Sequence, residues 1–511
     1  MGQTTLILMI ITVISKIFGF VRESVMAAYI GAGELKSIYT TAMSIPAVFT
    51  GIIVAGIKSA YIPVYSKVKN EKGEIQANKF TSNLLNILMV YGGISAILAF
   101  IFAKPISLLL SPDLSGESLA LTANFTRIIS MSIFPFLYSS VIDGLLNIKG
   151  NFFDPVIIEY IKNIIIVASI IWYSKNSNPY IIAVGTLIAL YLQFIRYPFA
   201  SRKIGFTHTK EINFKDPYIK YLMYMVVPIM FSSAANHLVL LVDNSMASAF
   251  FGVDSISKIF YAKVMLGFIS GVISLSISTV TFPEIAKIGQ SGDKEKMSKS
   301  INSAIILSMV LVVPSIFGMM ALSNPIIKLA FERNAFTAYD TRIVAQLVVS
   351  YGPYIIFITI QQLLSNAFYS VGDSKTPVVV TLILQAINIL FNIILSKFFG
   401  LNGLAYSTVF ANVVGSILML YLFKKRFGKA FYAASILSII KTVILSVIIS
   451  IVAIFMYNKL ISTHTLITSL FVSVLVAILI YIVGIVIVGI PEVSEVVKEA
   501  KIKINNNKDN I

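Results

Sequence analysis

The sequence predicts an all-α, polytopic membrane protein, and three observations support this class. More than half of the chain (57%) is hydrophobic and only 12% is charged, whereas an average soluble domain is about 25% charged. Apolar segments of about 20 residues, the length that crosses a bilayer as a helix, follow one another along the chain. Short segments rich in Lys and Arg separate many of them. We therefore expect fourteen transmembrane helices.

The positions and orientation of the helices follow from the apolar windows and the basic segments between them. The windows centre near residues 17, 48, 91, 132, 163, 189, 231, 268, 311, 355, 387, 412, 446 and 477. Alternate connecting segments and the C-terminal tail hold more than half of the 40 Lys and Arg residues. Because these residues accumulate on the cytoplasmic side, both termini are expected in the cytoplasm. The same bias accounts for most of the net charge of +17 without a nucleic-acid partner.

A weak internal repeat divides the expected helices into two lobes of six. Pro63 in "AYIPVYSKV" and Pro283 in "VTFPEIAKI" are 220 residues apart, and Pro105 and Pro325 have the same spacing. An even number of helices separates each pair, so the repeat is parallel and the lobes share one orientation. The expected parts are an N-lobe (1–203), a C-lobe (204–429), two additional helices, 13 and 14 (430–490), and a cytoplasmic tail (491–511).

The composition excludes several kinds of chemistry. The chain has no cysteine, and its three histidines lie far apart in the sequence, so neither thiolate catalysis nor a metal site is expected. It has no G-x-x-x-x-G-K-[ST] motif, which excludes a built-in P-loop ATPase. We expect a transporter without a cofactor. Such a protein changes no covalent bond and is not an enzyme.

Three charged residues lie inside the first apolar window, at Lys16, Arg22 and Glu23. A charge near the centre of a spanning helix costs about 2.5–3.5 kcal/mol on insertion scales, and such charges usually mark a transport pathway. Lys16 and Glu23 are two turns apart and share a helix face. The alternative is a buried ion pair that only fixes packing.

Two further bases, Lys58 at the end of the second helix and Lys263 inside the eighth, lie at similar expected depths. Transporters with two lobes place their substrate sites between them, near the bilayer midplane. Cationic side chains at this depth indicate an anionic substrate, and Lys and Arg suit phosphate oxygens. The expected substrate-binding residues are Lys16, Arg22, Glu23, Lys58 and Lys263.

A separate set of oxygen-bearing side chains could bind a cation. Asn388 and Asn392 share one face of the eleventh helix, and Asp243 and Thr408 could converge with them. Oxygen ligands of this kind suit a hard cation such as sodium. The alternative, which we favour for the asparagines, is interhelical hydrogen bonding.

Three longer motifs carry a family resemblance: "SKIFGFVRESVMAAYIGAG" (15–33), "AFERNAFTAYDT" (330–341) and "NAFYSVGDSKTPV" (366–378). Through them the chain resembles the MurJ/MviN lipid II flippases of the MOP exporter superfamily over its whole length. The resemblance implies fourteen helices, two six-helix lobes and a cationic central cavity for the pyrophosphate-linked head group of lipid II. It also implies that helices 13 and 14 form a groove for the polyprenyl tail. The first-helix bases and acid of the family match Lys16, Arg22 and Glu23.

Two positions depart from the pattern of that family. Where the family usually has an arginine after the helix-2 proline motif, this chain has Thr50 and Gly51, with Lys58 further along. In helix 8 the arginine of the family aligns with Val264, beside Lys263. Because lysine is a point charge and not a bidentate fork, these departures leave the identity of the carried lipid open.

The resemblance and the intramembrane bases together predict a flippase for lipid II or a similar polyprenyl-pyrophosphate lipid. It would work by alternating access in the bacterial cytoplasmic membrane, as a monomer surrounded by membrane lipids, with sodium as a candidate coupling ion. The alternatives are an exporter of another lipid-linked polysaccharide, a drug/cation antiporter and a structural scaffold. An antiporter for cationic drugs should line its cavity with carboxylates, whereas here the buried bases outnumber the acids.

Overall fold

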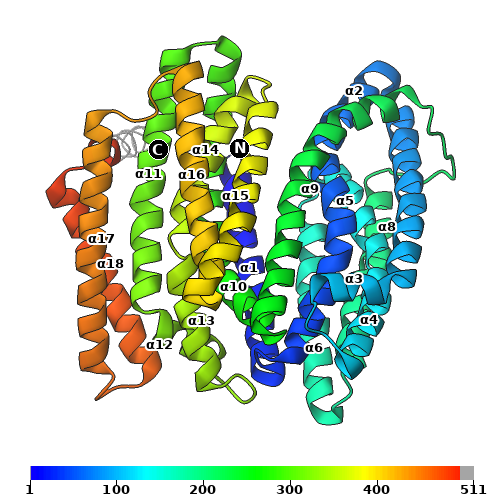
Figure 1. The fold of residues 1–511 in the computed structure, drawn as a ribbon. Helices are drawn as coiled ribbons and strands as arrows, with labels where there is room; N and C mark the ends of the chain where they lie inside the picture. Colours follow the sequence, from blue (N-terminus) through cyan, green and yellow to red (C-terminus); the bar gives the residue numbers. More distant parts are fainter. Residues whose placement is uncertain (1, 495–511) are drawn as a thin grey trace. The chain divides into compact units, whose positions relative to one another are not determined.

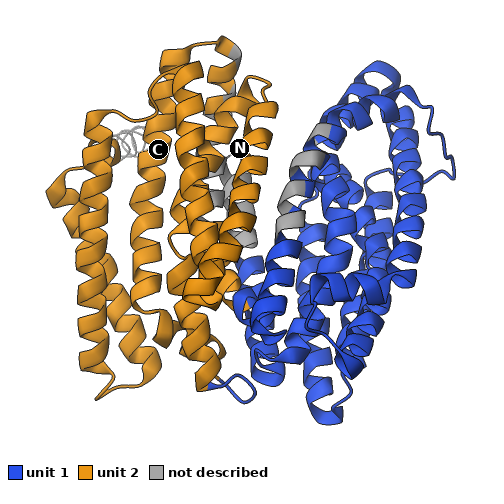
Figure 2. Ribbon diagram, in the orientation of Figure 1, with its two compact units in different colours: residues 1–260, 333–337 blue, residues 261–332, 338–511 orange. Residues whose placement is uncertain are grey.

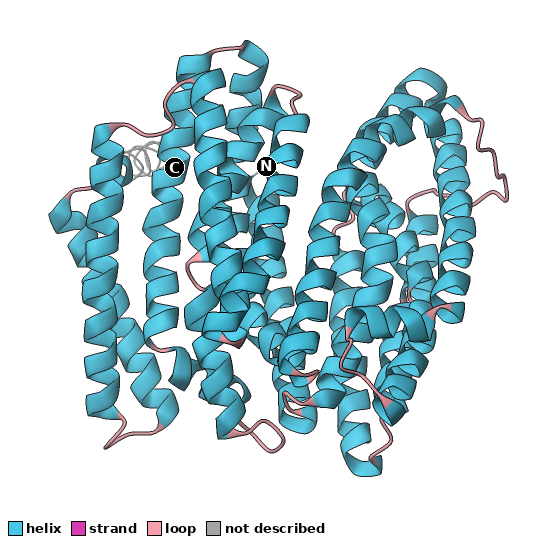
Figure 3. Ribbon diagram, viewed as in Figure 1, coloured by secondary structure: helices cyan, strands magenta, loops and turns pink. Residues whose placement is uncertain are grey.

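The computed structural model describes the backbone of residues 2–494 and most of their side chains. The side chains outside the description are those of residues 2–13, 59, 228, 231–232, 235–236, 238–239, 272–284, 286 and 290. Every regular element in the described range is an α-helix (Figure 3), which confirms the all-α class. Of the expected cytoplasmic tail, residues 495–511 lie outside the described residues.

The chain forms two compact units (Figure 2): unit 1 comprises residues 1–260 and 333–337, and unit 2 comprises residues 261–332 and 338–511. Unit 1 contains α1 (Gly2–Ile30), α2 (Glu34–Ile101), α3 (Ala103–Leu110), α4 (Gly116–Ser130), α5 (Ile133–Ile148), α6 (Phe153–Asn176), α7 (Tyr180–Tyr191), α8 (Gln193–Lys203) and α9 (Pro217–Phe251) (Figure 1). Helix α10 (Asp254–Ser291) begins in unit 1 and continues in unit 2. Unit 2 also contains α11 (Lys294–Ala321), α12 (Ser323–Phe331), α13 (Ala338–Tyr351), α14 (Tyr354–Ser370), α15 (Lys375–Phe399), α16 (Leu401–Phe427), α17 (Ala433–Leu460) and α18 (Leu466–Val488).

Ten helices in the described part of the chain are long and apolar enough to cross a membrane. The number becomes eleven if the bent pair α13 and α14 is counted as one span. These helices support a polytopic membrane protein. The exact count of fourteen spans stays a prediction.

Helix α2 differs in form from the two separate helices that the sequence predicts. The segment expected to connect the second and third spans is helical on both sides of a single break at Gly73, which has φ 81° and ψ 173°. Glycine adopts a positive φ without the steric cost that a Cβ atom brings. One glycine therefore reverses the chain between the two halves of α2 where a longer connection was expected (Figure 1).

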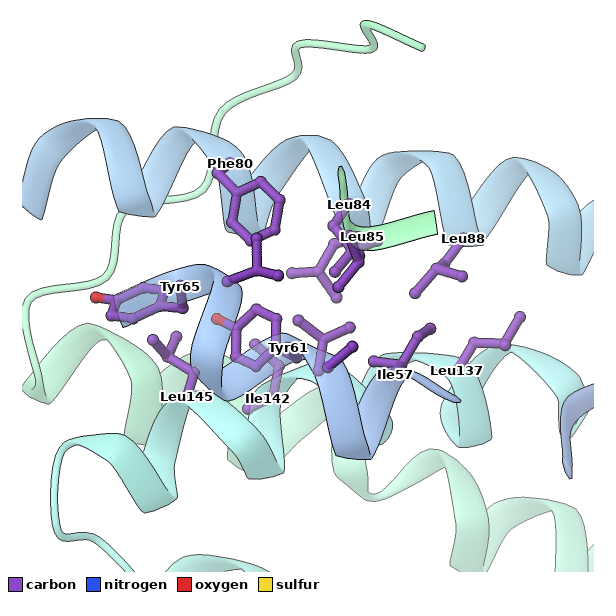
Figure 4. Packing of buried hydrophobic residues seen from close by; sticks show 14 of the residues in the cluster. Ile57, Tyr61, Tyr65, Phe80, Leu84, Leu85, Leu88, Leu137, Ile142 and Leu145 are labelled. Atoms are coloured by element: carbon purple, nitrogen blue, oxygen red, sulfur yellow. The ribbon is translucent and has the colours of Figure 1, made fainter. Parts of the chain in front are cut away.

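The two halves of α2 pack around a buried core that they share with α5 (Figure 4). The Tyr61 and Phe80 rings stack with centroids 6.3 Å apart, and the Tyr61 hydroxyl hydrogen-bonds with that of Thr81 at 2.8 Å. A tyrosine buried at this depth needs such a partner, because an unpaired hydroxyl is costly there. Leu137 and Ile142 of α5 complete the cluster. This core holds the two halves of α2 against α5.

Helix α9 packs against helices that precede it in the chain. The side chains of Ile219, Leu222 and Val226 from α9 join the same core cluster as Tyr61. The predicted lobe boundary between residues 203 and 204 was derived from the repeat and stays a prediction. The boundary between the compact units falls further along, within α10.

Residues 333–337 belong to unit 1, although the helices on either side of them belong to unit 2. The backbone N–H of Ala335 donates to the carbonyl of Ala28 at 3.0 Å, and Arg333 Nη1 donates to Ser24 Oγ at 3.3 Å. Gly31 has φ +77°, and a Cβ atom there would collide with the Ala335 carbonyl. The motif "AFERNAFTAYDT" therefore contributes a close backbone contact at the end of α1.

Candidate functional site

A buried ion cluster lies in unit 1, with Glu23 of α1 at its centre. Glu23 is only 4% exposed. Its Oε1 accepts hydrogen bonds from Arg22 Nη2 at 2.7 Å and Arg22 Nε at 3.2 Å. Its Oε2 accepts one from Lys36 Nζ at 2.8 Å. Both oxygens of the carboxylate are thus paired with a base, which is the arrangement that a buried charge requires.

Lys36 is the residue of this cluster that the sequence did not reveal. It lies in the first turn of α2 and is 0% exposed. Its ammonium lies 2.8 Å from Met26 Sδ and 4.2 Å from the centre of the Phe260 ring. The break between α1 and α2 spans only residues 31–33, so the chain turns back at once and brings Lys36 beside α1. The signal in the sequence was the short glycine-rich segment "GAG" before the lysine.

Arg22 also links α1 to α6. Its Nη1 donates to Asn163 Oδ1 at 3.0 Å, and Asn163 Nδ2 donates to the backbone carbonyl of Glu159 at 2.9 Å. The planar guanidinium holds partners along different edges, which an ammonium cannot do. One turn before Asn163, Glu159 accepts a 2.5 Å hydrogen bond from Lys162. Glu159 and Lys162 thus form a local i,i+3 ion pair within α6.

The charges of the cluster do not cancel. Arg22 and Lys36 carry two positive charges and Glu23 carries one negative charge, so the ionised cluster has a net charge of about +1. Positive charge among membrane helices is costly, which favours the approach of an anion. The cluster could therefore bind an anion without losing the ion pairs that hold it together.

The remaining predicted substrate-binding residues lie elsewhere. Lys16 is half-buried in α1, and in the described part of the chain it forms no ion pair with a carboxylate. Lys58 is exposed in α2 and interacts electrostatically with Asp143 of α5. Asp143 in turn accepts a hydrogen bond from the Tyr197 hydroxyl. Lys263 belongs to unit 2, where its ammonium lies 5.3 Å from the centre of the Tyr351 ring.

The position at which helix 2 lacks the expected arginine lies in close contact with α9. The imidazole of His237 in α9 occupies the space beside Gly51, and a Cβ atom at Gly51 would collide with that ring. Ser233 Oγ, one turn earlier in α9, donates to the Gly51 carbonyl at 3.2 Å. A side chain at residue 51 would require the His237 ring to move away. The departure from the pattern of the family is thus part of the packing between α2 and α9.

Three of the four candidate cation ligands meet in unit 2. Asn388 Nδ2 donates to Thr408 Oγ1 at 3.2 Å, and Asn392 Nδ2 donates to Asn388 Oδ1 at 3.2 Å. The first contact joins α15 to α16 and is an interhelical hydrogen bond of the kind that we favoured for the asparagines, whereas the second lies within α15. Asp243, which is 4% exposed, belongs to α9 in unit 1. A role of the four residues in sodium binding stays a prediction.

No group of three or more His, Cys, Asp or Glu side chains in the described part of the chain is arranged to hold a metal ion. The fold and the charges together define a class: a polytopic α-helical membrane protein with ion pairs buried among its helices, as transporters have.

Comparison with known proteins identifies the family within this class. The model of the family described as "Lipid II flippase MurJ" matches residues 26–477, so the chain belongs to the MurJ family. A probable lipid II flippase MurJ of Rickettsia prowazekii (strain Madrid E) is 28% identical over 419 residues, which cover 80% of this chain and 81% of that protein. One of Buchnera aphidicola subsp. Acyrthosiphon pisum (strain APS) is 27% identical over 419 residues, with the same coverage.

Solved structures agree with this assignment. The lipid II flippase MurJ in an inward closed conformation matches with a TM-score of 0.79 and 25% identity, over 94% of this chain and 98% of that one. An inward-facing multidrug resistance MATE transporter of the MOP superfamily matches with a TM-score of 0.66 and 14% identity, over 81% and 94% of the two chains. The second likeness concerns the fold alone. The expected family is confirmed, and membership of the MOP superfamily stays a prediction.

Proposed function

We propose that this protein is a lipid II flippase that moves an undecaprenyl-pyrophosphate-linked saccharide from the inner to the outer leaflet of the cytoplasmic membrane. The observation that carries the proposal is the ion cluster of Arg22, Glu23 and Lys36, buried among the helices of a MurJ-family chain. Its excess positive charge suits a diphosphate better than a cationic drug.

The chemistry asked of the site is binding and release, without any change of covalent bonds. Arg22 and Lys16 contact the phosphate oxygens from unit 1, and Lys58 and Lys263 supply further positive charge during transport. Glu23 stays bound to Lys36, which limits the competition of the carboxylate with the phosphates for Arg22. The lobes then rock about the site in alternating access.

The setting of the transport cycle is also part of the proposal. Both termini lie in the cytoplasm, as the distribution of Lys and Arg indicates, and the protein works as a monomer. Because the chain has no cysteine, labelling of single introduced cysteines from each side of the membrane tests the orientation.

In the proposed cycle, sodium binding at Asp243, Asn388, Asn392 and Thr408 couples lipid transport to the sodium gradient. Flipping that is independent of a sodium gradient would contradict this part.

Growth rescue tests the function directly. Expression of the chain in bacteria depleted of their own lipid II flippase should restore growth, because the depleted cells cannot deliver the precursor to the outer leaflet. The Lys16→Glu variant should express equally but fail to rescue, since it places a negative charge beside the phosphates. Purified protein in liposomes should expose lipid II on the opposite leaflet. Absence of both activities in a well-expressed protein, or export of a different lipid-linked saccharide, would contradict the proposal.

A cavity in unit 2 suits the polyprenyl tail that the proposal requires. It has a volume of about 330 Å³ and lies between α11, α12, α17 and α18. Most of its lining is apolar, with Ile449 and Ala453 from α17 and Val474 and Ile478 from α18. The Tyr481 hydroxyl at its edge donates to the Val310 carbonyl at 2.6 Å, which ties α18 to α11. Helices 13 and 14 of the prediction correspond to α17 and α18.

Filling this cavity should slow flipping. Val474 lines the cavity and is 37% exposed, whereas Val483 lies on the same helix, is 57% exposed and does not line it. Val474→Trp should reduce the flipping rate about fivefold or more, because the indole takes space that the tail must occupy, and forcing both groups into one site typically costs about 1–3 kcal/mol. Val483→Trp should leave the rate within twofold. Equal effects of the two tryptophans in the liposome assay would remove the cavity from the tail pathway.

A further inference from the structure

A second polar cavity lies in unit 1, apart from the ion cluster around Glu23. It has a volume of about 610 Å³ and lies between α5, the end of α8 and the segment 204–216 that follows α8. Its lining includes one fixed cation, Arg202, together with Ser201, Thr207, His208, Tyr138 and Phe206. None of the described residues that line it is acidic. The cavity thus combines a guanidinium and hydroxyl groups with two aromatic side chains.

The wall formed by the segment 204–216 is held in place by hydrogen bonds to α2. Asn78 Nδ2 donates to the Gly205 carbonyl at 3.1 Å, and Asn86 Nδ2 donates to the carbonyls of Thr209 and Glu211 at 2.8 and 2.7 Å. Asn83 both donates to the Asn213 carbonyl and accepts from its N–H, at 2.9 and 2.7 Å. Figure 1 shows this segment running as an extended chain beside α2. Asparagine side chains of α2 therefore fix a connection that has no regular structure of its own.

The same contacts fix the side chains that face the cavity. His208 Nε2 lies 2.9 Å from Asn86 Oδ1, which orients the imidazole ring. Phe206 is 4% exposed and packs into the core of unit 1. Thr207 lies between these two anchored residues in the chain. The wall of the cavity is consequently preformed, which lowers the conformational entropy that a ligand would have to overcome.

Arg202 carries the positive charge of the cavity. Burial lowers the pKa of His208 below its ordinary value, and the charge of Lys210 lowers it further. The imidazole therefore contributes hydrogen bonds and little charge at neutral pH. In the described part of the chain, Arg202 forms no ion pair with a carboxylate. Its electrostatic neighbour is the hydroxyl of Tyr138.

We propose that this cavity is a binding site for a phosphate-bearing anion. A guanidinium recognises phosphate oxygens through paired N–H donors, and Thr207 and Tyr138 offer hydroxyl donors around it. The phosphate can belong to the head group of an anionic membrane lipid or to a soluble phosphate compound. Both sources present the same chemistry, so the test uses one probe of each kind.

A fluorescent reporter on the full-length chain tests the site. The chain has no native cysteine, and Ile212, in the same segment, is 50% exposed and does not line the cavity. An environment-sensitive dye on the Ile212→Cys variant is titrated with inorganic pyrophosphate and with phosphatidylglycerol in mixed micelles. Phosphatidylcholine serves as the zwitterionic comparison. We expect a saturable change with pyrophosphate, with phosphatidylglycerol or with both, and none with phosphatidylcholine.

Two neighbouring bases provide the matched comparison. Arg202→Gln should weaken binding about tenfold or more, the loss typical of a charge-assisted hydrogen bond. Lys203→Gln removes the same charge one residue away, from a side chain whose ammonium stacks 5.4 Å from the Phe199 ring and does not line the cavity. It should change binding by less than twofold. Thermal unfolding of both variants should match that of the parent, because both positions are exposed.

The outcomes separate a built site from general surface charge. A response to phosphatidylglycerol alone identifies a lipid head group, and a response to pyrophosphate alone identifies a soluble phosphate compound. Equal losses in Arg202→Gln and Lys203→Gln would mean that the titrants respond only to the positive charge of the surface. That result would overturn the proposal, and so would the lack of a saturable response to either probe.

Discussion

Glu23→Gln should lower the free energy of unfolding by about 3–5 kcal/mol, the cost of removing one partner from a buried ion pair. The glutamine is of similar size, so the change removes charge and not volume. It leaves Arg22 and Lys36 as two neighbouring cations with no counter-charge between them, and Lys36 is 0% exposed. Reversible unfolding in mixed detergent micelles, followed by circular dichroism, measures the loss.

Glu159→Gln is the matched control for this experiment. Glu159 is also a membrane-helix carboxylate that binds a lysine, with its Oε1 2.5 Å from Lys162 Nζ, but its side chain is half exposed. Exposed pairs contribute about 0–1 kcal/mol, so the control should stay close to the parent. If both variants lost the same small amount of stability, Glu23 would be solvated and the cluster would not be a buried one.

The fold was predictable because its main signals repeat along the chain. Long apolar segments and the bias of Lys and Arg indicated a polytopic helical protein, and the resemblance indicated the MurJ family. The features that the sequence did not predict depend on single residues where the chain reverses direction. A positive φ at Gly73 converts an expected connection into one turn between two halves of α2, and the tight turn at residues 31–33 moves Lys36 into the bundle. Helical periodicity carries no information on such reversals.

The roles of the predicted site residues in substrate binding stay predictions, but the structure shows how these residues are paired. Arg22 and Glu23 are paired, but the second base on Glu23 is Lys36, whereas the shared helix face indicated Lys16. Helical spacing identifies neighbours within one helix only. A partner on the next helix depends on the length of the turn and on the packing between the helices. The contacts among Asn388, Asn392 and Thr408 could be predicted from the sequence, because two of these residues lie one turn apart on α15.

The pairing of Glu23 with Lys36 changes what a substitution at Arg22 can reveal. Because Lys36 Nζ stays 2.8 Å from Glu23 Oε2, loss of Arg22 does not leave the carboxylate unpaired. The effect on folding should therefore be small beside the effect on transport. A substitution at Arg22 therefore distinguishes a role in substrate binding from a role in packing.

Arg22→Ala should insert and fold but flip lipid II about ten- to a hundredfold more slowly, because one charge-assisted contact with the diphosphate is worth about 1.5–3 kcal/mol. Asn163→Ala is its control, since it removes the 3.0 Å contact of Arg22 with α6 but keeps the charge. That variant should keep most of its activity. Flipping into the opposite leaflet of liposomes and growth rescue give the readouts, with unfolding measured on the same samples.

Substitutions of Lys16 complete the experiment, because Lys16 is the second base of α1 that we propose to contact the phosphates. Lys16→Arg keeps the charge and should keep much of the activity, whereas Lys16→Glu should abolish it. The decisive variant combines Lys16→Ala with Arg22→Ala. If that double variant flipped lipid II normally but unfolded much more readily than the parent, both residues would serve packing alone. The phosphate contacts would then have to be sought at Lys58 and Lys263, since these are the other intramembrane bases that the sequence singled out.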